Sequence, residues 1–166
     1  MKQFKSLILS ASTLFVIPAL ILLLFRTTRF GINMFSPVVQ IVAGSAICLI
    51  GVALVVITIR MFIIIGRGTL APWDPPLRLV TEGIYSHVRN PMISGVLITL
   101  LGESLAVGSL GILAWAGFFF LINSAYFYFS EEKGLERRFG EEYIEYKRNV
   151  PRWLPRLKPR KKAGGE

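Results

Sequence analysis

Residues 83–95 read GIYSHVRNPMISG and join a polar loop to a long apolar run. A tyrosine, a histidine, an arginine and an asparagine lie here, directly before Pro91. Proline is favoured in the first turn of a helix because no N–H is needed there, so Pro91 predicts a helix start. Polar side chains at the mouth of an apolar helix are costly unless they are paired or functional. We therefore predict that this stretch opens a helix and forms one wall of a ligand pocket, whose other wall comes from elsewhere in the chain.

The composition indicates a small integral membrane protein. Hydrophobic residues make up 53% of the 166 residues and the mean hydropathy is +0.57, both above the values of ordinary soluble domains. A helix needs about 20 predominantly apolar residues to cross the hydrocarbon core. Four apolar runs are predicted as transmembrane helices, at 7–25, 37–65, 91–107 and 112–129. The fold class is therefore predicted to be all-α, a membrane helical bundle that forms a single domain over 1–166.

Small residues in the second run have two interpretations. Gly44 and Gly51, with Ser45 nearby, could let another helix approach closely, as small residues do in membrane proteins. The alternative is that they are ordinary small residues on a helix that faces lipid.

Two polar segments border the last two runs. Residues 66–90 are rich in glycine and proline and are predicted to have irregular backbone at the membrane surface, where exposed N–H and C=O groups can serve a ligand. Residues 131–149 are predicted to form one amphipathic helix. Its apolar face would lie along the membrane surface and consists of Leu135, Phe139, Tyr143 and Tyr146. Residues 159–166 are predicted to be a disordered basic tail.

The positive charges predict the orientation. Lysine and arginine collect on cytoplasmic loops, and here they lie near both chain ends and in the 66–90 loop. An active site formed by 66–91 and 131–155 would then face the cytoplasm. The net charge of +9 favours contact with anionic lipid headgroups and not with nucleic acid, because no recognition module is visible. One cysteine and one histidine argue against a metal site.

Five blocks of sequence share a recognisable order and spacing. They are LVTEGIY at 79–85, RNP at 89–91, EE at 131–132, FGEEYIEYKRNVP at 139–151 and LP at 154–155. These blocks resemble the isoprenylcysteine carboxyl methyltransferase family, with phospholipid methyltransferases as more distant relatives. The resemblance covers about 66–158, whereas 1–65, the two N-terminal spans, resemble nothing in particular. It implies S-adenosylmethionine as cofactor, bound without a dinucleotide-binding fold, and the chain indeed has no G-x-G-x-x-G motif after a strand.

The resemblance also implies which residues form the site. Arg89 and Glu131 are the expected catalytic residues, with Glu131 at the position of the family's cofactor-binding glutamate. The expected cofactor contacts are Leu77, Arg78, Leu79, Val80, Tyr85, Arg89, Asn90, Pro91, Met92, Ile93 and Glu131. Three positions depart from the family pattern: Asn90 replaces a histidine, Ile93 a tyrosine, and Phe127 an arginine that resembles a clamp for the substrate carboxylate.

The chemistry of methyl transfer assigns roles to these residues. The enzyme has to align donor and acceptor and exclude water, and a carboxylate acceptor needs no general base, whereas an amine or thiol does. His87 is either that base or a solvated loop residue. Arg89 either pairs with a carboxylate of the cofactor or a substrate headgroup or anchors the loop at the membrane surface. Glu132 and the acids at 141–145 are interpreted as helix-surface charges, beside a pocket roof formed by the tyrosines of the amphipathic helix.

Several functions remain open at this point. The first is an S-adenosylmethionine-dependent methyltransferase whose lipid-like or prenylated acceptor enters sideways from the bilayer, most like isoprenylcysteine carboxyl O-methylation. The second is N-methylation of an amino-lipid. The third is an oxidoreductase related to sterol reductases, which would need nucleotide-phosphate contacts that this chain lacks. The fourth is a non-catalytic membrane protein, which would bind no cofactor.

Overall fold

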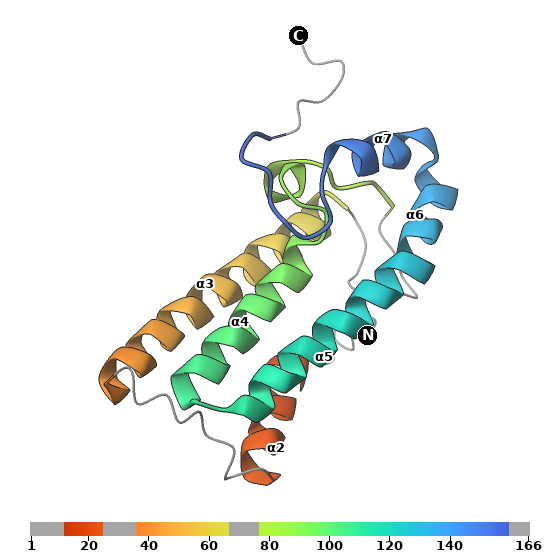
Figure 1. Ribbon diagram of the computed structural model, residues 1–166. Coiled ribbons are helices and arrows are strands. Elements are labelled where there is room, and N and C mark those ends of the chain that lie inside the picture. Colours follow the sequence, from red (N-terminus) through yellow and green to blue (C-terminus); the bar gives the residue numbers. More distant parts are fainter. Residues whose placement is uncertain (1–11, 25–35, 67–76, 160–166) are drawn as a thin grey trace.

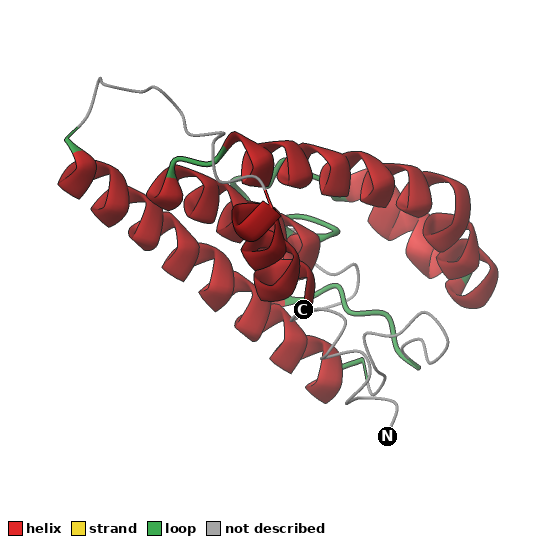
Figure 2. Cartoon of the chain, turned by 90° about the horizontal axis from the view of Figure 1, so that it is seen from below, coloured by secondary structure: helices red, strands yellow, loops and turns green. Residues whose placement is uncertain are grey.

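The computed structural model describes residues 12–24, 36–66 and 77–159. In these ranges every regular element is helical and no strand forms (Figure 2), which confirms the all-α prediction. The elements in chain order are η1 (Ser12–Val16), α2 (Ile17–Leu24), α3 (Pro37–Ile64), η2 (Gly83–Ser86), α4 (Pro91–Val107), α5 (Leu110–Tyr126), η3 (Phe127–Glu131), α6 (Glu132–Phe139) and α7 (Glu141–Asn149). The ends of the first predicted span and residues 160–166 of the predicted tail lie outside the described residues.

Helices α3 and α4 lie antiparallel and in close contact along a seam of glycines (Figure 1). A Cβ added at Gly44 would lie 2.6 Å from the Cα of Ala106, and one added at Gly51 would lie 2.5 Å from the backbone nitrogen of Thr99. On the other helix, a Cβ at Gly102 would lie 2.6 Å from the backbone nitrogen of Cys48. The backbones can approach this closely only because the glycines carry no side chain. The structure therefore confirms the first interpretation of these small residues, as a helix-packing surface.

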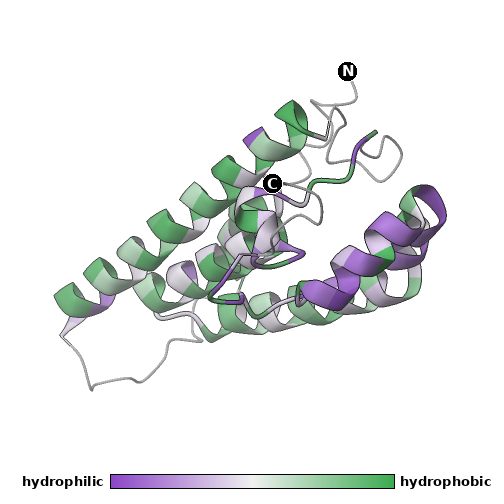
Figure 3. Ribbon diagram, turned by 90° about the horizontal axis from the view of Figure 1, so that it is seen from above, coloured by the Kyte–Doolittle hydropathy of each residue, from purple (hydrophilic) through white to green (hydrophobic). Residues whose placement is uncertain are grey.

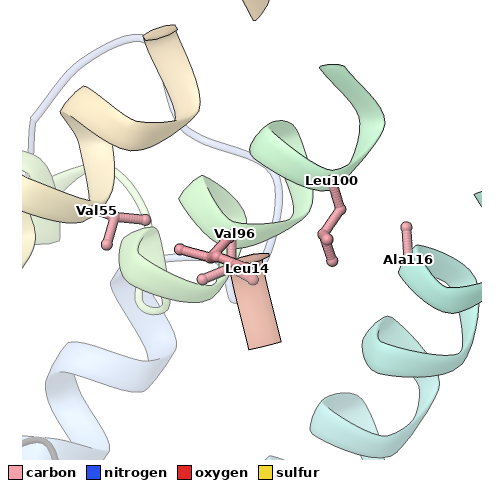
Figure 4. Close-up of a cluster of buried hydrophobic side chains, with 5 residues drawn as sticks. All are labelled: Leu14, Val55, Val96, Leu100 and Ala116. Atoms are coloured by element: carbon pink, nitrogen blue, oxygen red, sulfur yellow. The ribbon is translucent and has the colours of Figure 1, made fainter. Parts of the chain in front are cut away.

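The main apolar cluster joins the first segment to the three long helices. Leu14, Val55, Val96, Leu100 and Ala116 are all buried and come from η1, α3, α4, α4 and α5 respectively (Figure 4). Leu100 is fully buried. This cluster holds the four segments together at the middle of the bundle, because burying apolar side chains is the main favourable term in packing.

A tight turn connects α4 to α5, as the Gly108 and Ser109 pair predicts. Gly108 caps α4 with a left-handed φ of 69°, and Ser109 caps α5 by accepting a hydrogen bond from the Ile112 N–H at 3.4 Å. The Ser104 hydroxyl donates to the Ser109 carbonyl oxygen at 2.9 Å, which ties the two helices together at the turn. The two helices thus form a hairpin, and α4 has the predicted bounds, 91–107.

The surface of the long helices indicates a membrane protein. Among the described residues, two helical runs are long and apolar enough to cross a membrane, Pro37–Ile64 and the continuous run Leu110–Phe139. Large apolar side chains are exposed along both runs, and the ribbon of these helices is mostly green, the colour of hydrophobic residues, in Figure 3. Exposed members include Leu49 at 70% and Leu121 at 66%. In a soluble protein such helices would be buried, whereas lipid is a suitable environment for them.

The segment after α5 differs from its prediction as one amphipathic helix. A π-helical turn, η3, continues α5 into α6, and the chain then breaks at Gly140, with φ 54° and ψ −131°, before α7 begins. That backbone conformation is open almost only to glycine. The predicted apolar face also packs inward: Tyr143, Tyr146 and Val150 form a buried cluster with Leu79, Leu135 and Phe139 against it. The prediction of a single continuous helix was therefore wrong. The apolar face packs against other residues of the protein and does not lie along the membrane surface.

Candidate active site

The two polar segments that were predicted to face each other are hydrogen-bonded together. The Arg89 backbone N–H donates to the Pro151 carbonyl oxygen at 2.9 Å, and the Arg156 N–H donates to the His87 carbonyl oxygen at 3.0 Å. The His87 ring Nδ1 lies 2.7 Å from the Arg156 carbonyl oxygen, so this histidine is held by the C-terminal segment and is not simply solvated. Residues 77–90 and 150–156 therefore form one layer above the start of α4, next to α7 (Figure 1).

Beside this layer lies an aromatic cluster. The Tyr146 hydroxyl donates a hydrogen bond to the Tyr85 carbonyl oxygen at 2.7 Å, and the rings of Tyr143 and Tyr146 lie 6.1 Å apart between centroids. Burial, and then the charge of Glu131, raise the pKa of Tyr85. Burial, and then the charge of Glu132, raise the pKa of Tyr143. Since a free phenol titrates near pH 10, Tyr85 and Tyr143 keep their protons at neutral pH.

Glu132 is the centre of an ion-pair cluster. Its residue is only 4% exposed. One carboxylate oxygen, Oε1, accepts from Arg89 Nη1 at 2.9 Å and from Arg152 Nε at 2.8 Å, with Arg152 Nη2 at 2.7 Å. The other, Oε2, lies 2.9 Å from Lys147 Nζ, which also contacts Glu136 at 2.9 Å. A buried carboxylate is stable only with such partners, so the interpretation of Glu132 as a helix-surface charge was wrong.

Arg89 is buried in the same cluster. Its side chain is only 10% exposed. The interpretation of Arg89 as an anchor of the loop at the membrane surface was therefore wrong. One terminal nitrogen is bonded to Glu132, and the guanidinium also interacts with the Tyr143 hydroxyl. The remaining Nε is buried and has no hydrogen-bond partner among the residues that the structure describes. Buried donors are nearly always satisfied in native proteins, so this one indicates a missing acceptor.

Glu131 differs from its neighbour in its surroundings. It is the last residue of the π-helical turn η3 and is half-buried. It lies near enough to Tyr85 for its charge, after burial, to raise the pKa of that tyrosine. Within the described parts of the chain its carboxylate makes no hydrogen bond or ion pair, whereas that of Glu132 is fully engaged. Glu131 thus offers a carboxylate that no described residue engages, next in the sequence to the glutamate that binds Arg89.

The other predicted cofactor residues occupy three kinds of position. Leu77 and Arg78 are exposed, and their backbone N–H groups donate to the Gly66 carbonyl oxygen at the end of α3. Leu79 packs on the aromatic cluster and Val80 is buried. The residues at the start of α4 are buried or half-buried: Asn90, Pro91, Met92 and Ile93. Tyr85 is bonded to the aromatic cluster and Arg89 to the ion-pair cluster, and Glu131 is near enough to Tyr85 to influence its pKa. No described contact brings Leu77 or Arg78 to Glu131.

The sequence interpretation missed Glu132, Lys147 and Arg152 as members of the site. A signal for Glu132 was available, because it lies three residues before Leu135 and so continues the apolar stripe of Leu135, Phe139, Tyr143 and Tyr146. A carboxylate in an apolar stripe predicts burial with partners. The acids Glu141, Glu142 and Glu145 do not continue that stripe and are exposed as predicted.

Comparison with known proteins gives this arrangement a family. A family model described as phospholipid methyltransferase matches residues 39–142, which is more than half of the chain. The chain belongs to the phospholipid methyltransferase family. The match runs from α3 to the first residues of α7 and so includes the seam, the start of α4 and the glutamate pair.

Two relatives of this phospholipid methyltransferase family member are named as protein-S-isoprenylcysteine O-methyltransferases. It is 33% identical over 84 residues to protein-S-isoprenylcysteine O-methyltransferase B of Arabidopsis thaliana, covering 47% of this chain and 40% of that one. It is 32% identical over 83 residues to protein-S-isoprenylcysteine O-methyltransferase of Schizosaccharomyces pombe, covering 46% of this chain and 33% of that one. An uncharacterized protein of Haemophilus influenzae is 40% identical over 65 residues, all of its length and 38% of this chain. The chain matches less than half of the length of each of the two named methyltransferases. These matches confirm the resemblance to the isoprenylcysteine carboxyl methyltransferase family that the sequence blocks indicated.

Proposed function

We propose that this protein is an S-adenosylmethionine-dependent methyltransferase that acts on a membrane-embedded acceptor, most like a protein-S-isoprenylcysteine carboxyl O-methyltransferase. The observation that carries the proposal is the buried Nε of Arg89, which has no hydrogen-bond partner among the described residues. The carboxylate of Glu131, which no described residue engages, supplies the matching acceptor. The amino-acid end of the cofactor carries a carboxylate and an amine. The Arg89 donor fits the carboxylate, and the Glu131 acceptor fits the amine. Family membership supplies the reaction class.

The residues of this chain would then bind and orient the cofactor, which supplies a methyl group on a sulfonium. Arg89 would donate to the cofactor carboxylate through a charge-assisted hydrogen bond. Glu131 would accept from the amino group or from ribose hydroxyls. The loop residues Leu77, Arg78, Leu79, Val80 and Tyr85 and the helix start Asn90, Pro91, Met92 and Ile93 would enclose the rest. The aromatic cluster of α7 would exclude water, which methyl transfer requires.

The acceptor would reach this site from the bilayer. We propose that four helical segments cross the membrane. The polar end, where the ribbon of α6 and α7 is purple for hydrophilic residues in Figure 3, would face the cytoplasm beside anionic headgroups. An isoprenylcysteine carboxylate is ionised at neutral pH, so no residue has to remove a proton from it. The acceptor therefore has only to be positioned at the cytoplasmic end of the helices.

One observation favours a second candidate, N-methylation of an amino-lipid. Phe127 stands where the related enzymes are expected to carry a carboxylate-clamping arginine, and it is 8% exposed. Its ring packs on Trp153 at 6.0 Å and on Tyr126 at 5.9 Å between centroids. This apolar contact offers no cation to a carboxylate, so a zwitterionic or uncharged acceptor fits the position better.

Calorimetric titration of the purified protein in detergent with S-adenosylhomocysteine tests the proposal. We expect micromolar binding, weakened about tenfold or more in Glu131→Gln because a hydrogen bond to a charged group contributes about 1.5–3 kcal/mol. Glu142→Gln, an exposed acid on α7, is the matched control and should bind as wild type. Absence of binding, or equal binding by both variants, would contradict the proposal. Labelled cofactor offered with farnesylcysteine or with phosphatidylethanolamine then distinguishes the two acceptors by which one gains the label.

A further inference from the structure

We propose that Glu132 is a positioning residue, which holds Arg89 in the orientation that receives the carboxylate of the cofactor. This inference rests on the proposed function and assigns a second, separate role within the glutamate pair. Glu131 would touch the cofactor, and Glu132 would act only through Arg89.

The carboxylate of Glu132 has no capacity left for a ligand. An ionised carboxylate offers about four acceptor sites. Here Oε1 receives Arg89 and two nitrogens of Arg152, and Oε2 receives Lys147, all between 2.7 and 2.9 Å. With its side chain 5% exposed, Glu132 also has almost no open surface. Its influence on a bound molecule must therefore pass through one of these three cations.

Arg89 is the cation through which that influence passes. Its backbone N–H is fixed to the Pro151 carbonyl oxygen at 2.9 Å and its Nη1 to Glu132 at 2.9 Å. These two contacts restrain the side chain while the Nε edge has no acceptor among the described residues. Lys147 and Arg152 are less buried, with side chains 38% and 21% exposed, and Lys147 is shared with Glu136. Of the three, only Arg89 combines burial with an unused donor.

Without the charge of Glu132, the cluster would favour a different geometry. Arg89 and Arg152 share the single oxygen Oε1, so their guanidinium groups are held close together by the negative charge between them. Removing that charge leaves like charges near one another at low exposure, which is costly. The guanidinium of Arg89 would then turn away and the ordered Nε donor would be lost.

The test uses two ligands that differ at the carboxylate. S-adenosylhomocysteine has one, whereas 5′-methylthioadenosine lacks the whole amino-acid end. We expect Glu132→Gln to weaken S-adenosylhomocysteine binding about tenfold, the size of one hydrogen bond to a charged group, and to change 5′-methylthioadenosine binding less than about twofold. Glu132→Asp keeps the charge but withdraws the carboxylate from Arg89 by one methylene group, so it should weaken S-adenosylhomocysteine binding less than Glu132→Gln and still leave 5′-methylthioadenosine binding unchanged. This variant decides the question if the glutamine variant does not fold.

Two controls separate positioning from general stabilisation. Glu136→Gln removes a carboxylate that shares Lys147 but does not touch Arg89, and it should bind both ligands as wild type. Arg89→Met should lose S-adenosylhomocysteine affinity to a similar degree, and combining it with Glu132→Gln should add no further loss. Equal losses for both ligands, or additive losses in the double variant, would overturn the inference alone. A wild-type protein that binds neither ligand would overturn the proposed function together with it.

Discussion

The Tyr146 hydroxyl donates a hydrogen bond of 2.7 Å to the backbone carbonyl oxygen of Tyr85. Both residues are buried, at 3% and 7% exposure. This bond joins α7 to the short 3-10 turn η2, which directly precedes the loop that carries His87 and Arg89. The position of the expected cofactor loop therefore depends on a helix that follows it by about sixty residues.

Replacing Tyr146 with phenylalanine removes this bond and leaves the Tyr85 carbonyl buried without that donor. An unsatisfied buried acceptor costs about 1–3 kcal/mol, so we expect Tyr146→Phe to lower the thermal unfolding temperature in detergent and to weaken S-adenosylhomocysteine binding. Tyr128→Phe is the control, because that residue is 59% exposed and its ring still packs under Arg152. Matching unfolding temperatures for the two variants would show that the bond contributes nothing.

The glycine seam between α3 and α4 predicts a contrast between two alanine substitutions. At Gly51 a Cβ would lie 2.5 Å from the backbone nitrogen of Thr99, whereas at Gly117 on α5 nothing lies within 4 Å. Overpacking of this kind typically costs about 1–3 kcal/mol. We expect Gly51→Ala to destabilise the protein by that amount and Gly117→Ala to be neutral or slightly stabilising. Thermal unfolding in the same detergent measures both, and an undisturbed Gly51→Ala protein would contradict the close packing.

The break between α6 and α7 predicts a second contrast. Gly140 has a φ of 54° and a ψ of −131°, which a residue with a side chain adopts only at a cost of about 1–3 kcal/mol. Gly134 lies inside α6 with nothing within 4 Å of its missing Cβ, so alanine there should stabilise the helix by up to about 1 kcal/mol. Urea unfolding midpoints should therefore move in opposite directions for Gly140→Ala and Gly134→Ala. Two shifts of the same sign would show that the break tolerates a side chain.

The dependence of turnover on pH distinguishes the two proposed acceptors. A carboxylate acceptor is ionised throughout the range from about pH 6 to 8, so the rate with farnesylcysteine should vary little there when the cofactor is also saturating. Saturating cofactor is needed because burial, and then the charge of Glu132, raise the pKa of Glu131 to about 7. An amine acceptor is mostly protonated in that range, and its rate should rise with pH because only the neutral amine attacks. Initial rates with labelled cofactor at saturating acceptor measure this. A steep rise with farnesylcysteine would mean that a residue of the protein has to lose a proton first.

Much of the helical frame follows from local sequence signals. Pro91 starts α4 because the first turn of a helix needs no N–H from it. Gly108 ends α4 because glycine readily adopts the left-handed conformation of the cap. Gly44 and Gly51 form the packing surface on α3, which was one of the two interpretations that the sequence left open. Each of these signals belongs to a few neighbouring residues, so the sequence is sufficient to read them.

The ion-pair cluster could not be predicted in the same way. Glu132 is stabilised by Arg89, Lys147 and Arg152, which come from the α4 loop, α7 and the C-terminal segment. In the sequence each of these residues looks like an ordinary surface charge. The carboxylate of Glu132 can be buried only because all three cations contact it. The stripe that Glu132 extends was a signal for an inward-facing position that the surface-charge interpretation overlooked, but it does not specify which cations contact the carboxylate.

The π-helical turn Phe127–Glu131 has a consequence for comparing this chain with its relatives. A π turn holds one more residue than an α turn, and each residue of an α-helix advances by about 100° around the axis. A homologue with one residue fewer between the positions of the aromatic residues 126–129 and the glutamates 131–132 would therefore present a different side chain to the loop above α4. Gaps in an alignment at this turn report a rotation of the glutamate pair, so an identical pair of letters on either side of such a gap does not imply an identical site.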